Sequence, residues 1–454
     1  MLRVPSEVLS RDWSNFIVSL IGDLKPLGYF AQSDDDGSVT IGTWLPPDPR
    51  YRCAHDVRHR ALLKQNEADI RAFERDFADC FVDKDAFQPS SVRPALEIVD
   101  FKDPRHLRII GYLKLYQSVT SRKAVGRRMG LLIWDIGQSD TPKLFGAAIL
   151  SSARFSQRIR DRRLGWQPDF PKTSPRHDSA ARGIRVAGLN RIMQLSMACA
   201  LPPYSFLSGA WLAAMAPFTD VGLDAFRKSL KKPDSDADLI AVITTTGMDI
   251  SGTPFRGHRV AQIAPKGVAA VPGASGNLYS RVEPAEGSAS LRASFRDLLS
   301  QKVWDQARDL FREARPDRFS TLRSPYPSAM AYALRRFKLR KALFEGNEMG
   351  VHLGALGTNS LSYLQSGKAR PRNERPLLDW NQVVEVWSRR FLPAPATVGE
   401  STEEKFKAEH REARQRRLEA ARIFPADQIK LSYLLDADDP PRRLRLIDLA
   451  PLRK

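Results

Sequence analysis

Four short apolar runs constrain the fold of this chain more than any other feature. Each is bounded by Gly, Pro, Asp or Ser, and they occupy residues 131–134, 144–151, 192–200 and 239–246. Apolar runs of this length with such borders are typical of buried strands. The turn at residues 138–142 predicts that the first two runs form an antiparallel hairpin, and a helix-like run at 206–215 separates the third run from the fourth. This order of elements predicts an α/β fold with a mixed sheet as its core.

The segments on either side of this core have helical periodicity. Residues 6–30 and 57–81 carry apolar side chains at helical spacing, with one strand-like run at 39–44 between them. Residues 265–290 are rich in Gly, Ala, Pro and Ser, as is typical of a domain boundary, and helical patterns follow from residue 291 onward. We therefore predict three parts: a helical N-terminal module (1–90), the mixed α/β core (95–265) and a helical, basic C-terminal region (291–454).

The charge balance indicates the kind of partner. Lys and Arg number 71 against 52 Asp and Glu, which gives a formal net charge of +19. Such an excess suits a polyanion, so nucleic acid, DNA in particular, is the expected partner, although a solvated basic surface without a ligand is the alternative. The apolar windows fall short of the roughly 20 residues that span a bilayer, so no membrane partner is expected. Three unclustered cysteines and the lack of a leader pattern predict a cytoplasmic protein.

One basic segment lies inside the predicted core, between the second and the third run. A planar guanidinium can bond two phosphate oxygens at once, and a tryptophan among arginines offers a face on which a base can stack. Long connections of this kind are usually functional or disordered. A shorter basic loop at residues 121–128 precedes the first run. The predicted nucleic-acid-binding residues of the segment are Arg154, Arg158, Arg160, Arg162, Arg163, Trp166 and Arg191.

Catalytic patterns are sparse. The sequence has no GxSxG elbow, P-loop, HExxH or paired CxxC motif, and Cys53 with its nearby histidines is better explained as ordinary structure than as a metal site, so no metal is predicted. Asp249 follows the fourth run and could act as a general base if it is buried, or serve only as a turn residue. Asn190 could orient a phosphate or a carboxylate near it. Backbone amides at the start of the predicted helix could hold an anionic cofactor, with Ser205, Ser208 and Gly209 as the candidate residues.

Two blocks of this sequence resemble a known family. The first is residues 189–195, continuing through Pro202 and Pro203 into the helix-like run; the second is residues 239–245, then Asp249 and residues 252–256. These blocks, in this order, resemble the A-type proteins of the Druantia anti-phage defence system, over roughly residues 105–265. The resemblance implies a bacterial defence component that acts with other defence proteins, such as a helicase. It also adds Arg256 to the predicted nucleic-acid-binding residues.

The order of elements is also similar to the core of the Gcn5-related acetyltransferase superfamily, including its DNA-modifying Mom-type branch. That likeness implies an acyl- or carbamoyl-type transferase acting on a base or another acceptor, with acyl-coenzyme A as the cofactor. The chain departs from the superfamily because the Gln/Arg-x-x-Gly-x-Gly/Ala loop is absent between residues 200 and 208. It also departs from the defence family, because Thr245 stands where that family is expected to have an acidic residue. A third hypothesis is a structural subunit of a defence complex. A transferase requires an open split between strands 192–200 and 239–246.

Overall fold

In the computed structural model the chain forms two compact units. One comprises residues 1–65, 118–122 and 290–349, and the other comprises residues 66–117, 123–289 and 350–454. The structure describes residues 2–4, 11–25, 29–33, 35, 38–43, 59–60, 62–83, 85–116, 126–155, 157–166, 179–230, 239, 241–246, 278–282, 299–322, 326–336, 350–355, 360–366, 378–392, 415–421 and 429–436.

The first unit combines a small sheet with helices from both ends of its sequence. Strands β1 (Leu2–Val4), β3 (Val39–Thr43) and β2 (Tyr29–Ser33) form an antiparallel sheet in that order. Helix α1 (Arg11–Leu24) buries one apolar stripe and packs with α10 (Gln301–Ala314). Helices α11 (Pro316–Ser320) and α12 (Tyr326–Arg336) complete the unit, in which the rings of Phe311 and Tyr332 lie 5.5 Å apart.

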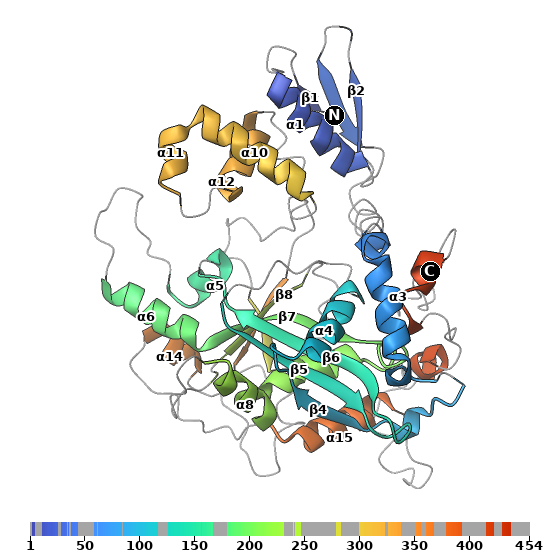
Figure 1. Cartoon of the computed structure of the whole chain (residues 1–454). Helices are drawn as coiled ribbons and strands as arrows, with labels where there is room; N and C mark the ends of the chain where they lie inside the picture. Colours follow the sequence, from blue (N-terminus) through green and yellow to red (C-terminus); the bar gives the residue numbers. More distant parts are fainter. Residues whose placement is uncertain are drawn as a thin grey trace, which may run out of the picture. The chain divides into compact units, whose positions relative to one another are not determined.

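A seven-stranded mixed sheet is the core of the second unit (Figure 1). All neighbouring strands are antiparallel except β7 and β8, which are parallel. In spatial order the strands are β4 (Pro94–Ile98), β5 (Arg128–Asp135), β6 (Lys143–Ser152), β7 (Ile192–Ala200), β8 (Ala241–Thr246), β10 (Gly350–Ala355) and β9 (Tyr279–Arg281). The predicted mixed α/β class, the hairpin of β5 with β6 and the strand that precedes a helix are confirmed.

The helices of the second unit bury the faces of this sheet. Every residue of β5 after Arg128 is buried. The aromatic side chains of Phe145 and Tyr204 stack 4.3 Å apart, and the Trp387 indole N–H donates to the Leu207 carbonyl at 2.9 Å. The helices are α3 (Glu67–Asp76), α4 (Pro104–Tyr116), α5 (Arg158–Arg163), α6 (Ser179–Asn190), α7 (Gly209–Met215), α8 (Asp220–Lys228), α14 (Ser360–Ser366), α15 (Trp380–Phe391) and α17 (Tyr433–Asp436), with short 3-10 turns η3 (Ala78–Cys80), η4 (Pro89–Ser91) and η5 (Ala216–Phe218).

A buried carboxylate fixes the end of β5. Asp135 is fully buried, and its Oδ1 accepts hydrogen bonds from the backbone N–H groups of Arg93 and Gly137 at 2.8 and 2.9 Å. Its Oδ2 accepts from the Tyr204 hydroxyl at 2.9 Å. Burial, and next the charge of Asp135, raise the pKa of Tyr204 well above its ordinary value, so this phenol remains a donor. These bonds join β5 to the turn that leads into α7.

Three elements depart from the sequence-based expectation. The N-terminal module contains the sheet β1-β3-β2 as well as a helix; only β3 was expected, from the strand-like run at 39–44, because β1 and β2 are too short for a period-two pattern to be recognised. Helices α5 and α6 lie within the connection that was expected to lack regular structure. The C-terminal region supplies β10, which pairs with β8 and β9.

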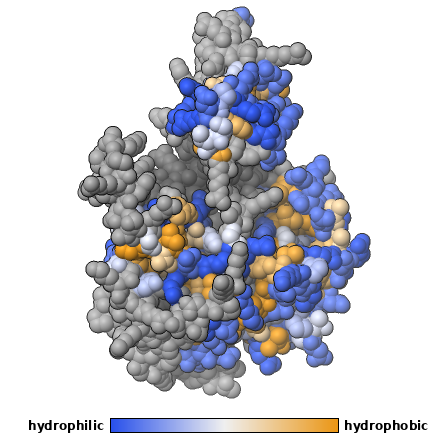
Figure 2. All heavy atoms as spheres, turned by 60° about the vertical axis from the view of Figure 1, so that its left-hand side comes forward, coloured by the Kyte–Doolittle hydropathy of each residue, from blue (hydrophilic) through white to orange (hydrophobic). Residues whose placement is uncertain are grey.

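The described surface is mainly polar. Figure 2 shows hydrophilic and hydrophobic residues intermixed on the face in view. The large apolar residues that the structure exposes are single and dispersed along the sequence, which is ordinary for a folded protein: Val18, Leu107, Ile136, Phe155 and Val186. Among the described residues, no helix has both the length and the apolar character needed to cross a bilayer.

Candidate nucleic-acid interface

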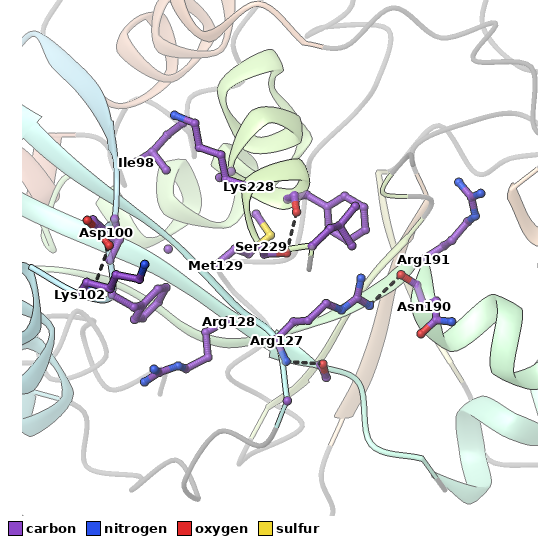
Figure 3. Close-up of a pocket in the computed structure, with 18 of the residues that line it drawn as sticks. Ile98, Asp100, Lys102, Arg127, Arg128, Met129, Asn190, Arg191, Lys228 and Ser229 are labelled. Carbon is purple, nitrogen blue, oxygen red and sulfur yellow. Dashed lines mark hydrogen bonds between the residues drawn. The ribbon is translucent and has the colours of Figure 1, made fainter. Parts of the chain in front are cut away.

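The second unit contains a basic cleft of about 1510 Å³, shown in Figure 3. Four segments far apart in the sequence form it: the turn between β4 and α4, the entrance to β5, the end of α6 and the end of α8. Tyr363 of α14 also lines it. The lining residues that carry charge are Lys102, Arg127, Arg128, Arg191, Lys228 and Asp100. We call this set, with the space between its members, the basic cleft.

The cations of the cleft come from different walls. In Figure 3, Lys102 and Arg128 lie on one side, Arg191 lies on the other and Lys228 comes from the end of α8. Five cationic side chains against the single carboxylate of Asp100 leave the lining strongly positive. A concave surface lined by charge of one sign concentrates the field and attracts oppositely charged ligands. The arrangement therefore suits an anion with several charges.

Arg127 is the anchored member of the set. Its guanidinium donates to the Asn190 carbonyl at 2.7 Å and lies 5.3 Å from the centre of the Phe226 ring. Its backbone N–H donates to the Ser152 hydroxyl at 2.9 Å. Burial lowers the pKa of this guanidinium from its ordinary value. Arg127 thus connects the entrance of β5 to the end of α6 and holds two walls of the cleft together.

Lys102, Arg128 and Lys228 are exposed and are available to a ligand. In the described part of the chain, none of the three forms an ion pair with a carboxylate. The Arg128 guanidinium lies 4.7 Å from the centre of the Phe101 ring. Burial, and next the charge of Arg128, lower the pKa of Lys114. The larger part of this shift comes from burial, and the smaller part shows that the charge of Arg128 acts on Lys114.

The turn that carries Lys102 is fixed by a buried histidine. The backbone N–H of Asp100 donates to His106 Nδ1 at 3.0 Å, which leaves Nε2 as the protonated nitrogen that faces Glu97 at 3.1 Å. The backbone N–H of Lys102 donates to Asp100 Oδ1 at 2.8 Å. Because these bonds engage the backbone, they position Lys102 while its ammonium group stays exposed.

The sequence-predicted site residues fall into separate places. Asn190 and Arg191 line the basic cleft. Arg154, Arg162 and Arg163 are exposed in and before α5, outside the lining, and Arg158 begins that helix. Asp249 and Arg256 lie outside the described residues. The structure therefore brings Asn190 and Arg191 together with cations that the sequence reasoning did not select: Lys102, Arg127, Arg128 and Lys228.

Arg160 and Trp166 are buried, and both side chains form hydrogen bonds with other protein groups instead of facing solvent. Arg160 is 0% exposed; its Nε donates to Asp161 at 2.8 Å and its Nη1 to the Arg154 carbonyl at 2.7 Å. Burial lowers the pKa of Arg160, and the charge of Asp161 partly opposes this shift. The guanidinium also lies 5.3 Å from the Trp166 ring, whose indole N–H donates to the Leu364 carbonyl. Solvent-borne phosphate does not reach either side chain in this conformation.

The predicted cofactor residues surround a tightly packed turn. The backbone N–H groups of Ser205 and Gly209 donate to the carbonyls of Leu201 and Tyr204, both at 2.9 Å. Gly209 is buried, and a Cβ at this position would lie 2.6 Å from the Ala200 Cβ. Ser208 adopts a left-handed conformation with φ of 59°. The amides of Ser205 and Gly209 are thus already engaged by the protein.

Comparison with known proteins identifies one family. Residues 49–232 match the family model described as Druantia protein DruA, a range that includes the cleft residues up to Leu230 and ends before the second block, residues 239–256. No curated protein and no solved structure matches the chain. As the sequence predicted, the chain is similar, over its residues 49–232, to the Druantia protein DruA family.

Proposed function

We propose that this protein is the component of a Druantia anti-phage defence system that engages nucleic acid, and that the basic cleft is the place of contact. The match of residues 49–232 to the DruA family model supports a role in Druantia defence. The observation that carries the nucleic-acid part is the clustering of Lys102, Arg128 and Lys228, which are exposed and without ion pairs among the described residues. Keeping such cations close together is unfavourable unless a polyanion neutralises them.

The second support is that the cleft belongs to the part of the chain that defines the family. All its lining residues except Tyr363 fall within residues 49–232. Exposed Arg162 and Arg163 of α5 lie in the same range and could extend the contact surface beyond the cleft. Phosphate contacts supply most of the affinity in such complexes and carry no sequence information, so we expect binding with weak sequence preference.

A salt titration with matched variants tests this proposal. Each neutralised phosphate contributes about −0.9 to the slope of log affinity against log salt on duplex DNA and about −0.7 on a single strand. The triple variant Lys102→Gln/Arg128→Gln/Lys228→Gln is therefore expected to reduce the magnitude of that slope by about two to three. A double variant Arg162→Gln/Arg163→Gln measures the contribution of α5.

The control is a triple variant of equal charge change, Lys302→Gln/Arg315→Gln/Arg318→Gln, whose side chains are exposed in the other compact unit and do not line the cleft. If the two triple variants lose the same affinity, bulk charge accounts for binding and the cleft has no special role. A protein that binds no nucleic acid at low salt, when folded and monodisperse, would refute the proposal.

One observation favours the transferase as a second candidate. The parallel pairing of β7 with β8 runs from Ile192↔Ala241 to Leu195↔Thr244, whereas β7 continues to Ala200 and β8 to Thr246. A split between these strands is what an acyl-coenzyme A enzyme needs. The engaged amides of Ser205 and Gly209 oppose a cofactor at that turn. Calorimetry with acetyl-coenzyme A tests this second candidate. Saturable binding would support the transferase, and the absence of any heat of binding would eliminate acetyl-coenzyme A as its cofactor.

A further inference from the structure

We infer that the basic cleft accommodates a single, unpaired nucleic-acid strand rather than the outside of a duplex. This inference rests on the proposed function and specifies its ligand. The cations line a pocket to which separate elements contribute, and Figure 3 shows Lys102 and Arg128 on one side of it and Arg191 on the other. A duplex keeps its bases paired inside and offers mainly phosphates to a recess, whereas an unpaired strand can place bases and phosphates in it together.

The size of the cleft favours a strand over a small anion. Its volume of about 1510 Å³ exceeds the roughly 300–1,000 Å³ that is usual for small-molecule and cofactor pockets. A mononucleotide would leave most of this space and several of the cations without contacts. A strand of several nucleotides would bring one phosphate near each exposed cation. The ends of separate elements form the walls of the cleft. One continuous strand can therefore contact all of these walls at once.

The cleft also provides surfaces for stacking. The guanidinium of Arg128 lies over the Phe101 ring, which supports one face of the planar group, while Arg128 itself is exposed. Phe226, beside Arg127, and Tyr363 are the other aromatic residues of the lining. Planar guanidinium groups and aromatic rings stack on bases of any identity, which is how proteins bind single strands without reading their sequence. Cations interleaved with aromatic side chains are thus the combination that an unpaired strand requires.

The first experiment compares ligands of equal length by fluorescence anisotropy at 150 mM salt. The probes are a 20-nucleotide dT strand, a 20-nucleotide rU strand and a 20-base-pair duplex. We expect the dT strand to bind at least tenfold more tightly than the duplex, and the rU arm tells whether the strand is DNA or RNA. Duplex binding as tight as or tighter than both strands would overturn the inference but leave the proposed function intact. No binding of any probe would refute the proposed function itself.

The second experiment separates stacking from charge. Phe101→Leu keeps every cation but removes the ring under Arg128, so the dT strand is expected to bind about fivefold more weakly while the salt slope is unchanged. Phe155→Leu is the matched control, because Arg185 lies 4.5 Å from this exposed ring, which does not line the cleft. Thermal melting verifies that both variants fold. Equal affinity of Phe101→Leu and the wild-type protein for dT would overturn the stacking role of the cleft.

Discussion

The buried pair Arg160 and Asp161 provides the sharpest test of the basic segment. Asp161 is 1% exposed and accepts from Arg160 Nε at 2.8 Å, from Arg185 Nη2 at 3.0 Å and from the Gln157 backbone N–H at 2.9 Å. Asp161→Ala removes the carboxylate that pairs with Arg160 in the described part of the chain and leaves a guanidinium charge buried without compensation. Removing one member of a buried ion pair typically costs about 3–5 kcal/mol, which is the expected loss in free energy of unfolding.

Urea denaturation followed by tryptophan fluorescence measures this loss, and Trp166 beneath Arg160 is a local probe. For a denaturant slope of about 2 kcal/mol per M, the unfolding midpoint should fall by roughly 2 M. Asp161→Asn keeps the shape and an acceptor oxygen but not the charge. Its unfolding midpoint should lie between those of Asp161→Ala and the wild-type protein. Arg163→Ala, on the exposed side of α5, should stay within about 0.5 kcal/mol of the wild-type protein. If Asp161→Ala is as mild as Arg163→Ala, the reasoning about this buried pair is refuted.

Three further predictions follow from other contacts. Tyr204→Phe leaves Oδ2 of buried Asp135 without its donor and should lower the free energy of unfolding by about 1–3 kcal/mol, measured by urea denaturation. Burial raises the pKa of the Cys199 thiol to about 12, so iodoacetamide at pH 8 should leave it unmodified in the folded protein and label it in urea, as mass spectrometry of peptides can establish. Arg128→Gln should raise the pKa of Lys114 toward its ordinary value of 10.5, as an NMR titration of lysine can measure; an unchanged pKa would show that burial alone causes the shift.

The pH dependence associated with Lys114 has a definite sign. Its pKa is lowered in the folded protein, so the folded state binds this proton less strongly than the unfolded state does. Lys114 therefore lowers the free energy of unfolding at pH values below the pKa that it has in the folded protein. This penalty diminishes as pH rises from the folded pKa toward 10.5. A phosphate placed near Arg128 would oppose the part of this shift that Arg128 causes, so binding of a strand should be accompanied by proton uptake at alkaline pH.

The sheet was predictable because the residues that identify its strands lie within the strands and at their ends. Strands β5, β6 and β7 are apolar runs with turn residues at their ends, and α1 has a regular apolar stripe. Strand β10 was not predictable in the same way, because it contains two glycines, and its place beside β8 depends on pairing between residues about 100 positions apart in the chain. A long-range pairing of this kind is set by tertiary packing and leaves little trace in the period of a short segment.

The candidate site was only partly predictable, because the sequence does not reveal which arginines face inward. Arg160 and Arg163 belong to one cluster of the sequence, yet the first is fully buried and the second exposed. The presence of Asp161 beside Arg160 could have indicated an internal pair. Lys102 is followed by Asp103 and Lys228 lies in a separate basic run with Arg227, so their relation to each other becomes visible only when the fold brings them to one cleft. The basic loop at residues 121–128 was the available signal for Arg127 and Arg128.

Helix α6 connects the basic segment to the cleft. The buried residues of that segment therefore influence the cleft without touching a ligand. Near its middle, Arg185 bonds Asp161, and Gly188 packs so closely that a Cβ there would lie 2.4 Å from the Trp166 ring. At its end, the Asn190 carbonyl accepts from Arg127, and Asn190 lines the cleft. Because the helix is anchored at both places, loosening the Asp161 contacts should displace the cleft wall. Asp161→Ala is therefore expected to weaken strand binding under folding conditions although Asp161 is an acidic, buried residue that no phosphate touches.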